Sequence, residues 1–463
     1  MPSALRACVR GSLRPQASAF VAFLAPNSSA YLCYSLAVMV CGGVSVHLNW
    51  RMPTATTAHL LLSLQPTLLL TAAPLHLDAA TATAGRDELR VARLDEPLMS
   101  GRAPSSSDVV ATLCASSASR LDPHATAVVF FTGGTTGTPK AVPHTHAGLL
   151  WFAAHCAEAL PAPGEGTVCF TPYFHVMGFV ANFVFNLYLP SPQITQCRCA
   201  RCLQCPVPPD RLALCASPRY LGCRACVLAE DAHASLSPQI LLDACRVLRP
   251  SALNTVPWIL EDVVVRLGGA DGAEVAAALQ PLELVTYGGA ALAPHCAEVL
   301  KAHAFRIAGT YGQTELAGPV LFGALGGDPN ALRPMRGVQH MLVRRPASAD
   351  ASADDADVDA DVGELVLLGN MSATSGYLTL EPGRAHRSLT GDGTTGRTPQ
   401  EHYRTNDLFR YVAIDGDQWL VYMCRRDDVL VHTSGEMTNP LPWELRDHTA
   451  PLLCPLPPVP SAH

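Results

Sequence analysis

The sequence predicts an α/β fold, and three observations point to that class. Short apolar runs alternate with segments of helical pattern over residues 20–74 and again over 167–320. Gly, Pro, Asn and Ser mark the changes from one kind of segment to the other. Residues 363–378 and 407–431 instead alternate apolar runs with Gly turns. Because alternating strands and helices are typical of parallel sheets, we expect parallel sheets followed by an antiparallel portion.

The individual elements of the amino-terminal half follow in order. Residues 20–53 read as a strand, an Asn/Ser cap, a helix, a Gly turn and a second strand. Residues 59–74 continue with a helix and a strand. The apolar run at 126–131 is rich in β-branched and aromatic residues and is bounded by turn formers, so it reads as a buried strand.

The later elements continue the same alternation. Residues 167–188 read as a strand, an aromatic turn and a helix, and residues 249–292 add another set of helix and strand. Residues 305–320 read as a strand that runs into a loop bounded by glycines. The remaining segments, 363–378 and 407–431, look antiparallel.

Composition and charge exclude several function classes. With 463 residues, 49% of them hydrophobic and 15% charged, the chain can bury a large core in two or three domains or subdomains. Its formal charge of −7 argues against a nucleic-acid partner. The apolar stretch at 31–48 is broken by Gly42 and Gly43, so we expect no membrane span. Seventeen cysteines without a secretory leader indicate free thiols and a cytoplasmic location, with organelle import left open.

A loop rich in glycine and threonine follows the strand expected at 126–131. Glycines let the backbone approach a ligand closely, and successive N–H groups, hydroxyls and the Lys140 ammonium suit a phosphate. The P-loop pattern is excluded, because Pro139 precedes the lysine and no Ser or Thr follows it. A flexible turn without a ligand is the alternative. The predicted phosphate-binding residues are Thr132, Gly133, Gly134, Thr135, Thr136, Gly137 and Lys140.

The segment from Thr132 to Lys140 resembles the signature loop of the adenylate-forming enzymes: acyl-CoA synthetases, luciferases and the adenylation domains of peptide synthetases. Five further segments resemble this family's motifs in the family's order: YGGAAL at 287–292, YGQTELAGP at 311–319, YRTNDL at 403–408, CRRDD at 424–428 and SGEMTNPLPWE at 434–444. The resemblance extends over roughly residues 20–444. It implies the large N-terminal domain of that fold, with two parallel-sheet α/β subdomains and a small antiparallel β-barrel.

The resemblance assigns roles to the first two of these motifs. Gly288, Gly289 and Ala290 would line the adenine and acyl pockets. The Tyr311 ring would stack on adenine, with Gly312 and Gln313 beside it in the nucleotide site. Thr314 would hydrogen-bond a phosphate or the acyl carbonyl, and Glu315 would hold Mg²⁺, which prefers carboxylate and phosphate oxygens.

The resemblance also assigns the ribose partners. Asp407 would accept both ribose hydroxyls, and Arg425 would reach the ribose. Asn406 and Cys424 stand where the family usually has glycines. Asp427 would be the hinge to a C-terminal lid domain.

The acyl pocket is expected at 173–179, where the sequence YFHVMGF resembles the family's pocket segment. His175 would lie near the substrate carboxylate, and a packing role is the alternative. Relatives that activate amino acids usually carry an aspartate here, which this stretch lacks. Because a buried ammonium without a partner is costly, we expect a small carboxylic acid without an α-amino group. The catalytic residues are then expected to be Thr314, Glu315, His175 and Lys140.

The resemblance implies ATP- and Mg²⁺-dependent activation of the acid as an acyl-adenylate. In a complete member the acyl group then passes to a thiol, either that of CoA or the phosphopantetheine of a carrier protein. We expect residues 1–426 to form the AMP-binding large domain and 427–463 to be a remnant of the hinge and of the lid. The lid of relatives supplies a lysine, whereas this sequence has only Lys140 and Lys301, so the lid domain is expected to be largely missing. A truncated, non-catalytic nucleotide- or acyl-binding relic is the alternative function.

Two segments interrupt the resemblance. Residues 189–220 are rich in Cys and Pro and read as an insertion or an unspliced segment that lies exposed outside the fold. The alternative is a zinc site, for which the spacing of Cys202, Cys205, Cys223 and Cys226 is suitable. Residues 346–362 contain six aspartates from Asp350 to Asp361 and read as a solvated acidic loop. A calcium loop is the alternative there, although the Gly and the closing Glu are lacking.

Overall fold

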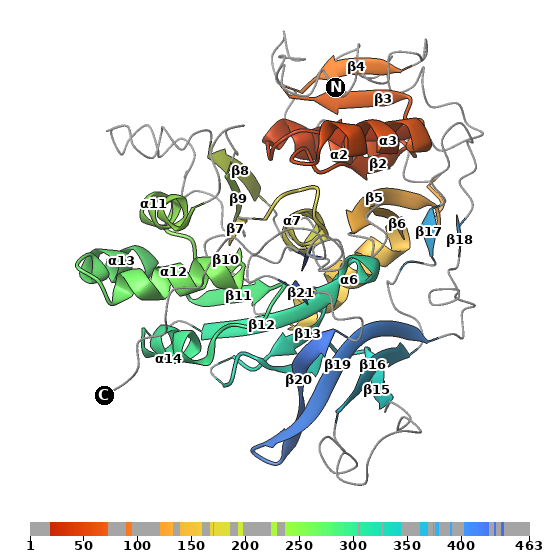
Figure 1. Ribbon diagram of the computed structural model, residues 1–463. Helices are drawn as coiled ribbons and strands as arrows, with labels where there is room; N and C mark the ends of the chain where they lie inside the picture. The colour runs from red at the N-terminus through yellow and green to blue at the C-terminus, as the bar shows by residue number, and fades with distance from the viewer. Residues whose placement is uncertain are drawn as a thin grey trace, which may run out of the picture.

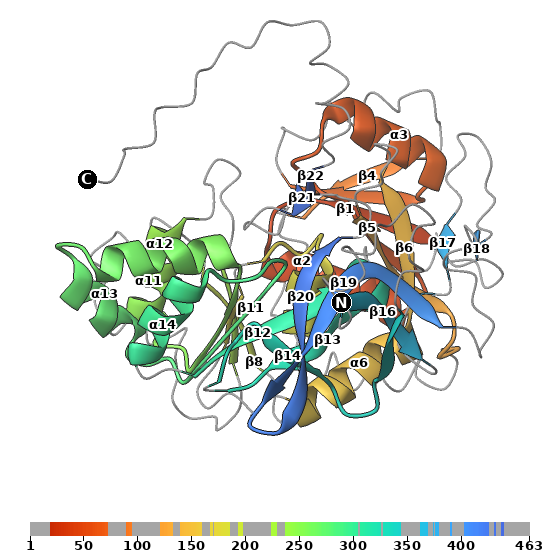
Figure 2. The same ribbon diagram turned by 60° about the horizontal axis from the view of Figure 1, so that its bottom comes forward.

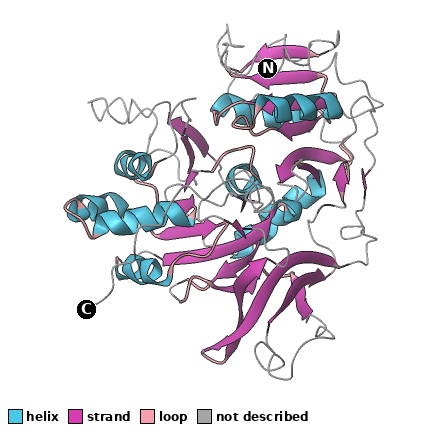
Figure 3. Cartoon of the chain, in the orientation of Figure 1, coloured by secondary structure: helices cyan, strands magenta, loops and turns pink. Residues whose placement is uncertain are grey.

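The computed structural model describes residues 19–72, 89–94, 121–132, 139–159, 167–169, 171–185, 193–197, 224–228, 237–303, 306–325, 327–343, 362–368, 374, 376–378, 389–390, 402–425, 430–431 and 437–438. Two large sheets make up this part of the chain, with helices between them and on their outer faces (Figures 1 and 3). The predicted α/β class is therefore confirmed. The hinge residue Asp427, the acidic loop at 346–362 apart from Val362, and most of the segment 427–463 lie outside the described residues.

The first sheet has eight strands among the described residues, in the order β18-β17-β6-β5-β2-β1-β3-β4. Its parallel strands are β1 (Phe20–Leu24), β2 (Val44–His47), β3 (Leu68–Thr71), β4 (Arg90–Arg93) and β5 (Thr126–Thr132). Antiparallel pairing adds β6 (Lys140–Thr145), β17 (Tyr377–Leu378) and β18 (Leu389–Thr390). The helices α2 (Ser29–Val40) and α3 (Thr54–Leu64) connect the first strands, as the sequence predicts for 20–74.

Local sequence explains the first helix. The Ser28 side chain caps α2 by accepting a hydrogen bond from the Tyr31 amide at 3.0 Å. The helix ends before Gly42, which has φ of +80°, a conformation that favours glycine. The chain then turns directly into β2, whose four residues are all buried.

The loop rich in glycine and threonine joins β5 to β6, which pair antiparallel with Thr132 opposite Lys140. The two ends of the predicted phosphate loop are therefore neighbours across a hairpin. Residues 133–138 at its centre lie outside the described residues, so the roles of Gly133, Gly134, Thr135, Thr136 and Gly137 stay predictions.

The second sheet has twelve described strands, in the order β15-β16-β19-β20-β14-β13-β12-β11-β10-β7-β9-β8. Its parallel strands are β7 (Thr167–Cys169), β8 (Gln193–Cys197), β9 (Arg224–Leu228), β10 (Ala252–Thr255), β11 (Leu284–Gly288) and β12 (Arg306–Gln313). Its antiparallel strands are β13 (Gly318–Gly323), β14 (Ala331–Pro334), β15 (Gln339–Val343), β16 (Val362–Leu368), β19 (Tyr403–Ile414) and β20 (Asp417–Arg425). A separate pair, β21 (Leu430–Val431) and β22 (Met437–Thr438), completes the described strands.

The antiparallel strands continue the parallel sheet instead of forming a sheet of their own, because the chain reverses between β12 and β13. Ala317 makes this reversal possible with φ of +61°. The antiparallel portion also curls strongly. In a flat sheet, β12 and β19 would lie about 19 Å apart, since three strands at about 4.8 Å spacing separate them. Side chains of these two strands nevertheless touch, with Tyr311 Oη 2.7 Å from Asp407 Oδ2.

Helices cover the sheets on distinct faces. α6 (His146–Ala159) and α7 (Val176–Gly178), which a π-helix (Phe179–Val184) extends, share one core with strands of both sheets. Figure 1 shows α7 between the upper and lower sheets. The helices α11 (Pro238–Leu248), α12 (Pro257–Leu267), α13 (Gly272–Leu279) and α14 (Pro294–Ala302) form a second core against β10, β11 and β12. These four helices gather on one side of the molecule (Figure 2).

Part of the Cys- and Pro-rich segment differs from expectation. We expected residues 189–220 to lie outside the fold, but 193–197 form β8, which pairs with β9 at the edge of the second sheet. Strand propensity in QITQC and the open edge of β9 account for this pairing. Cys202, Cys205 and Cys223 lie outside the described residues, so the zinc alternative stays open.

Candidate active site

The predicted site residues gather where the parallel strands of the second sheet end. Gly288 is the last residue of β11 and pairs with Thr310 of β12, next to Tyr311. The carboxyl ends of parallel strands are the usual location of ligand sites in α/β proteins. β19 and β20 bring Asp407 and Arg425 to the same place from the far end of the sheet.

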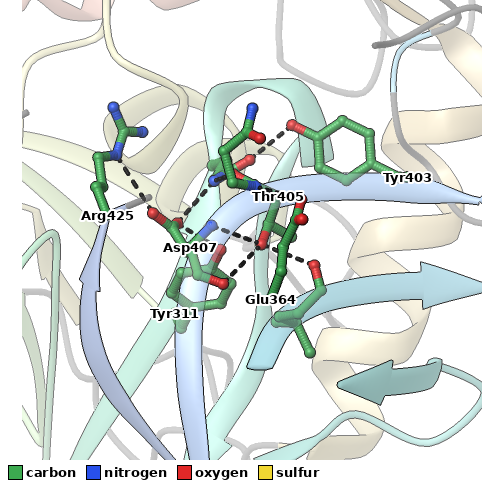
Figure 4. A network of polar contacts seen from close by, with 9 residues as sticks. Tyr311, Glu364, Tyr403, Thr405, Asp407 and Arg425 are labelled. Atoms are coloured by element: carbon green, nitrogen blue, oxygen red, sulfur yellow. Dashed lines mark hydrogen bonds and ion pairs between the residues drawn. The ribbon is translucent and has the colours of Figure 1, made fainter. Parts of the chain in front are cut away.

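Asp407 is the centre of a buried polar cluster, shown in Figure 4. Only 3% of this residue is exposed, and its Oδ2 accepts hydrogen bonds from the Tyr311 hydroxyl at 2.7 Å and from Gln313 Nε2 at 2.8 Å. Arg425 Nε lies 3.3 Å from Oδ1. Tyr403 in turn donates to Gln313 Oε1 at 2.6 Å. The structure thus brings Asp407 and Arg425 to Tyr311 and Gln313, although Asp407 lies 96 residues after Tyr311 in sequence.

Strand register explains how this cluster forms. Asp407 and Arg425 are direct partners across β19 and β20, so their side chains are neighbours on one face. Thr405 fixes the backbone of the motif: its hydroxyl donates to the Leu365 carbonyl at 2.8 Å and accepts from the Asp407 amide at 3.1 Å. The curl of the sheet then carries Asp407 against Tyr311.

Tyr311 has a role in the described structure besides the predicted stacking of its ring on adenine. Its side chain is buried, its ring meets Phe409 edge-on at 4.8 Å, and its hydroxyl points at Asp407. Burial and the neighbouring Asp407 carboxylate raise the pKa of Tyr311 well above its usual value, so the hydroxyl stays a donor. In this arrangement Tyr311 orients Asp407, and stacking on a base stays a prediction.

The backbone explains why an asparagine can replace the usual glycine before Asp407. Asn406 has φ of +57°, in the left-handed region that asparagine tolerates better than most residues with a side chain. The backbone amide of Asn406 donates to the buried carboxylate of Glu364 at 3.3 Å, and Glu364 also forms an ion pair with Arg404. The backbone bend at Asn406 is therefore held by the buried carboxylate of Glu364, which the exposed Arg404 also contacts.

We expect N406V to lower the unfolding free energy by about 1–3 kcal/mol, because a β-branched residue is strained at positive φ. N406G should change stability little and is the matched control. Thermal or urea unfolding of both variants measures the difference. Equal stability of N406V and N406G would contradict the strain.

Glu315 occupies the short 3₁₀ turn Thr314–Leu316 between β12 and β13, and only 8% of it is exposed. Its Oε1 accepts a hydrogen bond from the Tyr377 hydroxyl at 2.8 Å. Burial raises the pKa of Glu315, while the Tyr377 hydrogen bond and the charges of Arg425 and Lys140 oppose that shift. Gln313, which donates to Asp407, precedes Glu315 by two residues, and Tyr377 contacts both Glu315 and Lys140, so the two sides of the site adjoin one another.

Thr314 and Lys140 flank Glu315. His144 Nε2 lies 2.7 Å from the Thr314 carbonyl oxygen, so this nitrogen carries a proton and fixes the turn to β6. Lys140 begins β6, and its Nζ lies 4.8 Å from the centre of the Tyr377 ring. A carboxylate, a hydroxyl-bearing turn and an ammonium group therefore lie near the base of the predicted phosphate loop.

His175 caps the short helix α7, where its Nδ1 accepts a hydrogen bond from the Met177 amide at 3.2 Å. The side chain is exposed, yet the protein around it lowers its pKa to about 4 by desolvating the charged form. At neutral pH the ring is uncharged, and the hydrogen bond at Nδ1 leaves its proton on Nε2.

The GGA loop packs against the same region. A Cβ on Gly288 would lie 2.7 Å from Met177 Cε and from Thr310 Oγ1, so only glycine fits there. Gly289 has φ of +94°, and Ala290 follows it. Asn330 holds the loop by accepting from the Leu292 amide at 3.1 Å and donating to the Leu292 carbonyl at 2.8 Å. The loop and the helix of His175 are thus in contact through Gly288 and Met177.

Several residues of the site were not singled out by the sequence. Tyr377, Tyr403, His144 and Asn330 position the predicted residues, and each acts across a long sequence separation. Gly-Tyr at 376–377 and the histidine of the strand after the glycine-rich loop are the only local signals. Neither is specific enough to indicate a contact.

Comparisons with known proteins identify the family. The model of the AMP-binding enzyme family matches residues 10–189 and 211–378, more than half of the chain. The gap between these ranges falls within the Cys- and Pro-rich segment, and Asp407 and Arg425 lie beyond the matched ranges. Among the described residues, no helix is both long and apolar enough to cross a membrane.

One curated relative and two solved structures illustrate the similarity. A probable CoA ligase from Humulus lupulus is 30% identical over 178 residues, which cover 36% of this chain and 32% of that ligase. A benzoate CoA ligase from Burkholderia xenovorans LB400 has a TM-score of 0.64 at 18% identity, covering 92% of this chain and 74% of that one. O-succinylbenzoate coenzyme A synthetase from Bacillus subtilis, in complex with ATP and magnesium ion, has a TM-score of 0.58 at 17% identity, covering 95% and 77%.

The sequence match thus spans about a third of the length of the curated relative, and the structural likeness establishes the fold. The matched ranges include the loop rich in glycine and threonine, His175 and the segment of Tyr311 to Glu315. By the extent of the family match, this chain belongs to the AMP-binding enzyme family of adenylate-forming ligases.

Proposed function

We propose that the chain binds ATP with Mg²⁺ and activates a carboxylic acid as its acyl-adenylate, releasing pyrophosphate. The observation that carries the proposal is the convergence of the Asp407 cluster with Glu315 and Lys140 beside the hairpin strands β5 and β6, which flank the predicted phosphate loop. One relative of the same fold is described in complex with ATP and magnesium ion, which supports the same ligands for this chain.

The side chains near the expected positions of ribose, Mg²⁺ and phosphate have the chemistry that these groups require. A buried carboxylate held by Gln313 and Arg425 can accept hydrogen bonds from the two hydroxyls of a ribose. Glu315 is a carboxylate next to the expected phosphates, which suits Mg²⁺. When bound, Mg²⁺ would neutralise charge on the phosphates. Lys140 and the loop of Thr132–Gly137 would hold the β- and γ-phosphates, and Thr314 the α-phosphate or the acyl carbonyl.

In the proposed reaction, a carboxylate oxygen of the acid forms a bond to the α-phosphorus. The bond from that phosphorus to the bridging oxygen breaks, and pyrophosphate leaves with its electron pair. His175 would donate from Nε2 to the other carboxylate oxygen and orient the acid, because Nδ1 is occupied by the Met177 amide. Gly288, Gly289 and Ala290 would line the acyl and adenine pockets.

We propose a small carboxylic acid without an α-amino group, since 173–179 offers no acidic partner for an ammonium. A thiol of CoA or of a carrier protein is the proposed acceptor in the complete reaction. Among the described residues, Cys33, Cys41, Cys156, Cys245 and Cys296 are free thiols, which supports a cytoplasmic location, with organelle import left open.

Exchange of labelled pyrophosphate into ATP, measured over a panel of carboxylic acids, tests this function. We expect exchange that depends on Mg²⁺ and on one class of acid. Nucleotide binding without exchange for any acid would instead favour the non-catalytic relic.

We expect H175A to lower acid-dependent exchange roughly tenfold through a higher KM for the acid, because one hydrogen bond to a charged group is lost. ATP affinity should be unchanged. Since the pKa of His175 is about 4, its contribution should be constant above about pH 5 and be altered only as pH falls towards 4, when the ring gains a proton. A tenfold loss of ATP affinity in H175A would contradict the assignment to the acid.

A further inference from the structure

A short segment from the middle of the antiparallel region reaches back to the predicted phosphate side of the site. Thr374 and the strand β17 (Tyr377–Leu378) lie more than 200 residues after β6 in sequence, yet Leu378 pairs with Ala141 of β6. Ala141 directly follows Lys140. β17 therefore continues the first sheet along the strand that carries Lys140.

The same segment also holds the turn of Glu315. The Thr374 amide donates to the Glu315 carbonyl at 2.7 Å, and the Thr374 hydroxyl donates to the Gly376 carbonyl at 2.8 Å. The Tyr377 hydroxyl donates to Glu315 Oε1 at 2.8 Å. Both the backbone and the side chain of Glu315 are thus bound by residues 374–377.

Tyr377 connects the two elements through opposite parts of one side chain. Its hydroxyl contacts the Glu315 carboxylate, and its ring faces the Lys140 ammonium at 4.8 Å from the ring centre. An aromatic ring attracts a cation by its face, and this attraction is stronger when water is excluded. A rigid ring therefore fixes the separation between a carboxylate and an ammonium that belong to different sheets.

We propose that Tyr377 is a positioning residue for the triphosphate end of the nucleotide, holding Glu315 through its hydroxyl and Lys140 through its ring. The inference rests on the proposed function, because it assigns Glu315 to Mg²⁺ and Lys140 to the phosphates. It adds Tyr377, which belongs neither to the loop rich in glycine and threonine nor to the segment 311–319 that contains Glu315. The adenosine end of the site depends on the cluster around Asp407, in which Tyr311 and Gln313 hold the carboxylate.

This division gives a specific expectation. Loss of the Tyr377 hydroxyl frees the Glu315 side chain to take other rotamers, and loss of the ring also frees Lys140. Both effects concern the β- and γ-phosphates and the metal, which ATP has and AMP lacks. A purely structural role would weaken both nucleotides alike.

The first arm of the test reads the contact without any nucleotide. The sequence has only two lysines, Lys140 and Lys301, so reductive ¹³C-methylation labels these two and the N-terminal amine while keeping their charge. We expect the Lys140 methyl signal to be displaced by the ring current in wild type and in Y377F, and to lose this displacement in Y377L. Lys301, which contacts Glu298, is the internal reference. An undisplaced Lys140 signal in wild type would overturn the proposal.

The second arm measures the dissociation constants of AMP and of ATP with Mg²⁺ by calorimetry. For Y377F we expect ATP to bind roughly tenfold more weakly and AMP to bind within about twofold of wild type, since a hydrogen bond to a charged group is removed. Y377L should weaken ATP further. Y411F is the matched control, because it removes a hydroxyl that contacts His340 outside the site.

The outcomes separate the two proposals. Unchanged ATP affinity in Y377F, or equal weakening of ATP and AMP, would overturn the role of Tyr377 while the proposed function stands. Failure of wild type to bind either nucleotide would refute the proposed function and this inference with it. Thermal unfolding of Y377F checks that the variant is folded, and Y377F keeps the ring if Y377L does not fold.

Discussion

D407N should abolish measurable AMP and ATP binding, lowering the affinity at least a hundredfold. The wild-type carboxylate accepts hydrogen bonds from the Tyr311 hydroxyl and Gln313 Nε2, and it forms an ion pair with Arg425. An amide offers only one oxygen and presents an NH₂ group where a donor already points. Two hydrogen bonds from ribose to a charged acceptor contribute about 3–6 kcal/mol together, and each 1.4 kcal/mol is a factor of ten.

The same substitution should also lower the unfolding free energy by about 1–3 kcal/mol, because it weakens the buried hydrogen bonds from Tyr311 and Gln313 and leaves the partly buried Arg425 without its carboxylate. Stability must therefore be measured beside affinity. Y311F offers a milder variant that removes one donor to Asp407 but keeps the carboxylate. We expect it to retain nucleotide binding.

D417N is the matched control for this experiment. Asp417 starts β20 at the turn of the same hairpin, at the end far from Asp407, and its exposed side chain pairs with Arg333 at the surface. We expect D417N to bind nucleotide as wild type does. Wild-type affinity for AMP in D407N would contradict the assignment of Asp407 to the ribose.

The fold class could be predicted because each strand and each helix is indicated by the residues within it and at its ends. Ser28 before α2, Gly42 after it and the short apolar strands are each specified by their own residues. The motifs in turn predicted which residues belong together, and the structure brings Tyr311, Asp407 and Arg425 into one cluster.

The rest depends on pairing between distant segments, which a local pattern does not encode. The register that sets Asp407 opposite Arg425, the curl that brings β19 to β12 and the return of Tyr377 to β6 are all long-range. The edge strand β8 is a further example, since its sequence is short and its partner β9 follows only after residues 198–223. The buried hydrogen bonds of His144 and Tyr377 follow from these pairings.

His47 is another residue that the sequence did not single out. Its environment leads us to expect that the stability of the protein depends on pH. The side chain is fully buried among the rings of Phe23, Tyr31, Phe130 and Phe179. Its Nδ1 donates to the Tyr173 carbonyl at 2.8 Å. Its Nε2 accepts from Ser45 at 2.8 Å, and Ser35 lies 2.7 Å from the Ser45 hydroxyl. All polar atoms of the neutral ring are therefore satisfied.

Burial lowers the pKa of His47 from 6.5 to about 3, and the Tyr173 carbonyl opposes that shift only in part. The folded protein thus resists a proton that the unfolded chain binds below pH 6.5. The stabilisation is complete above that pH, is lost as pH falls, and is exhausted near pH 3. The slope should be about 1.4 kcal/mol per pH unit, or about 5 kcal/mol in all.

H47Q removes the titrating group, and urea unfolding of wild type and H47Q between pH 7 and 4.5 measures its effect. H47Q should be less stable than wild type at pH 7. The difference in unfolding free energy between the two proteins should become smaller by about 2–3 kcal/mol by pH 4.5, because only wild type loses the contribution of His47. Other histidines titrate equally in both proteins and cancel in the difference. Parallel curves for the two proteins would show that His47 takes up a proton in the folded state as readily as in the unfolded chain.

The position of His47 connects this stability to the site. The Tyr173 carbonyl that it holds lies two residues before His175, in the turn that begins α7. Asn27 fixes the same turn from the first sheet, since its Oδ1 accepts from the Tyr173 amide at 2.8 Å and its Nδ2 donates to the Thr171 carbonyl at 3.1 Å. The neutral His47 ring anchors this turn through its hydrogen bond to the Tyr173 carbonyl, and protonation of the buried ring destabilises this arrangement. As the pH is lowered, wild type should therefore lose pyrophosphate exchange with the carboxylic acid substrate before it loses affinity for ATP. A simultaneous loss of both would indicate global unfolding alone.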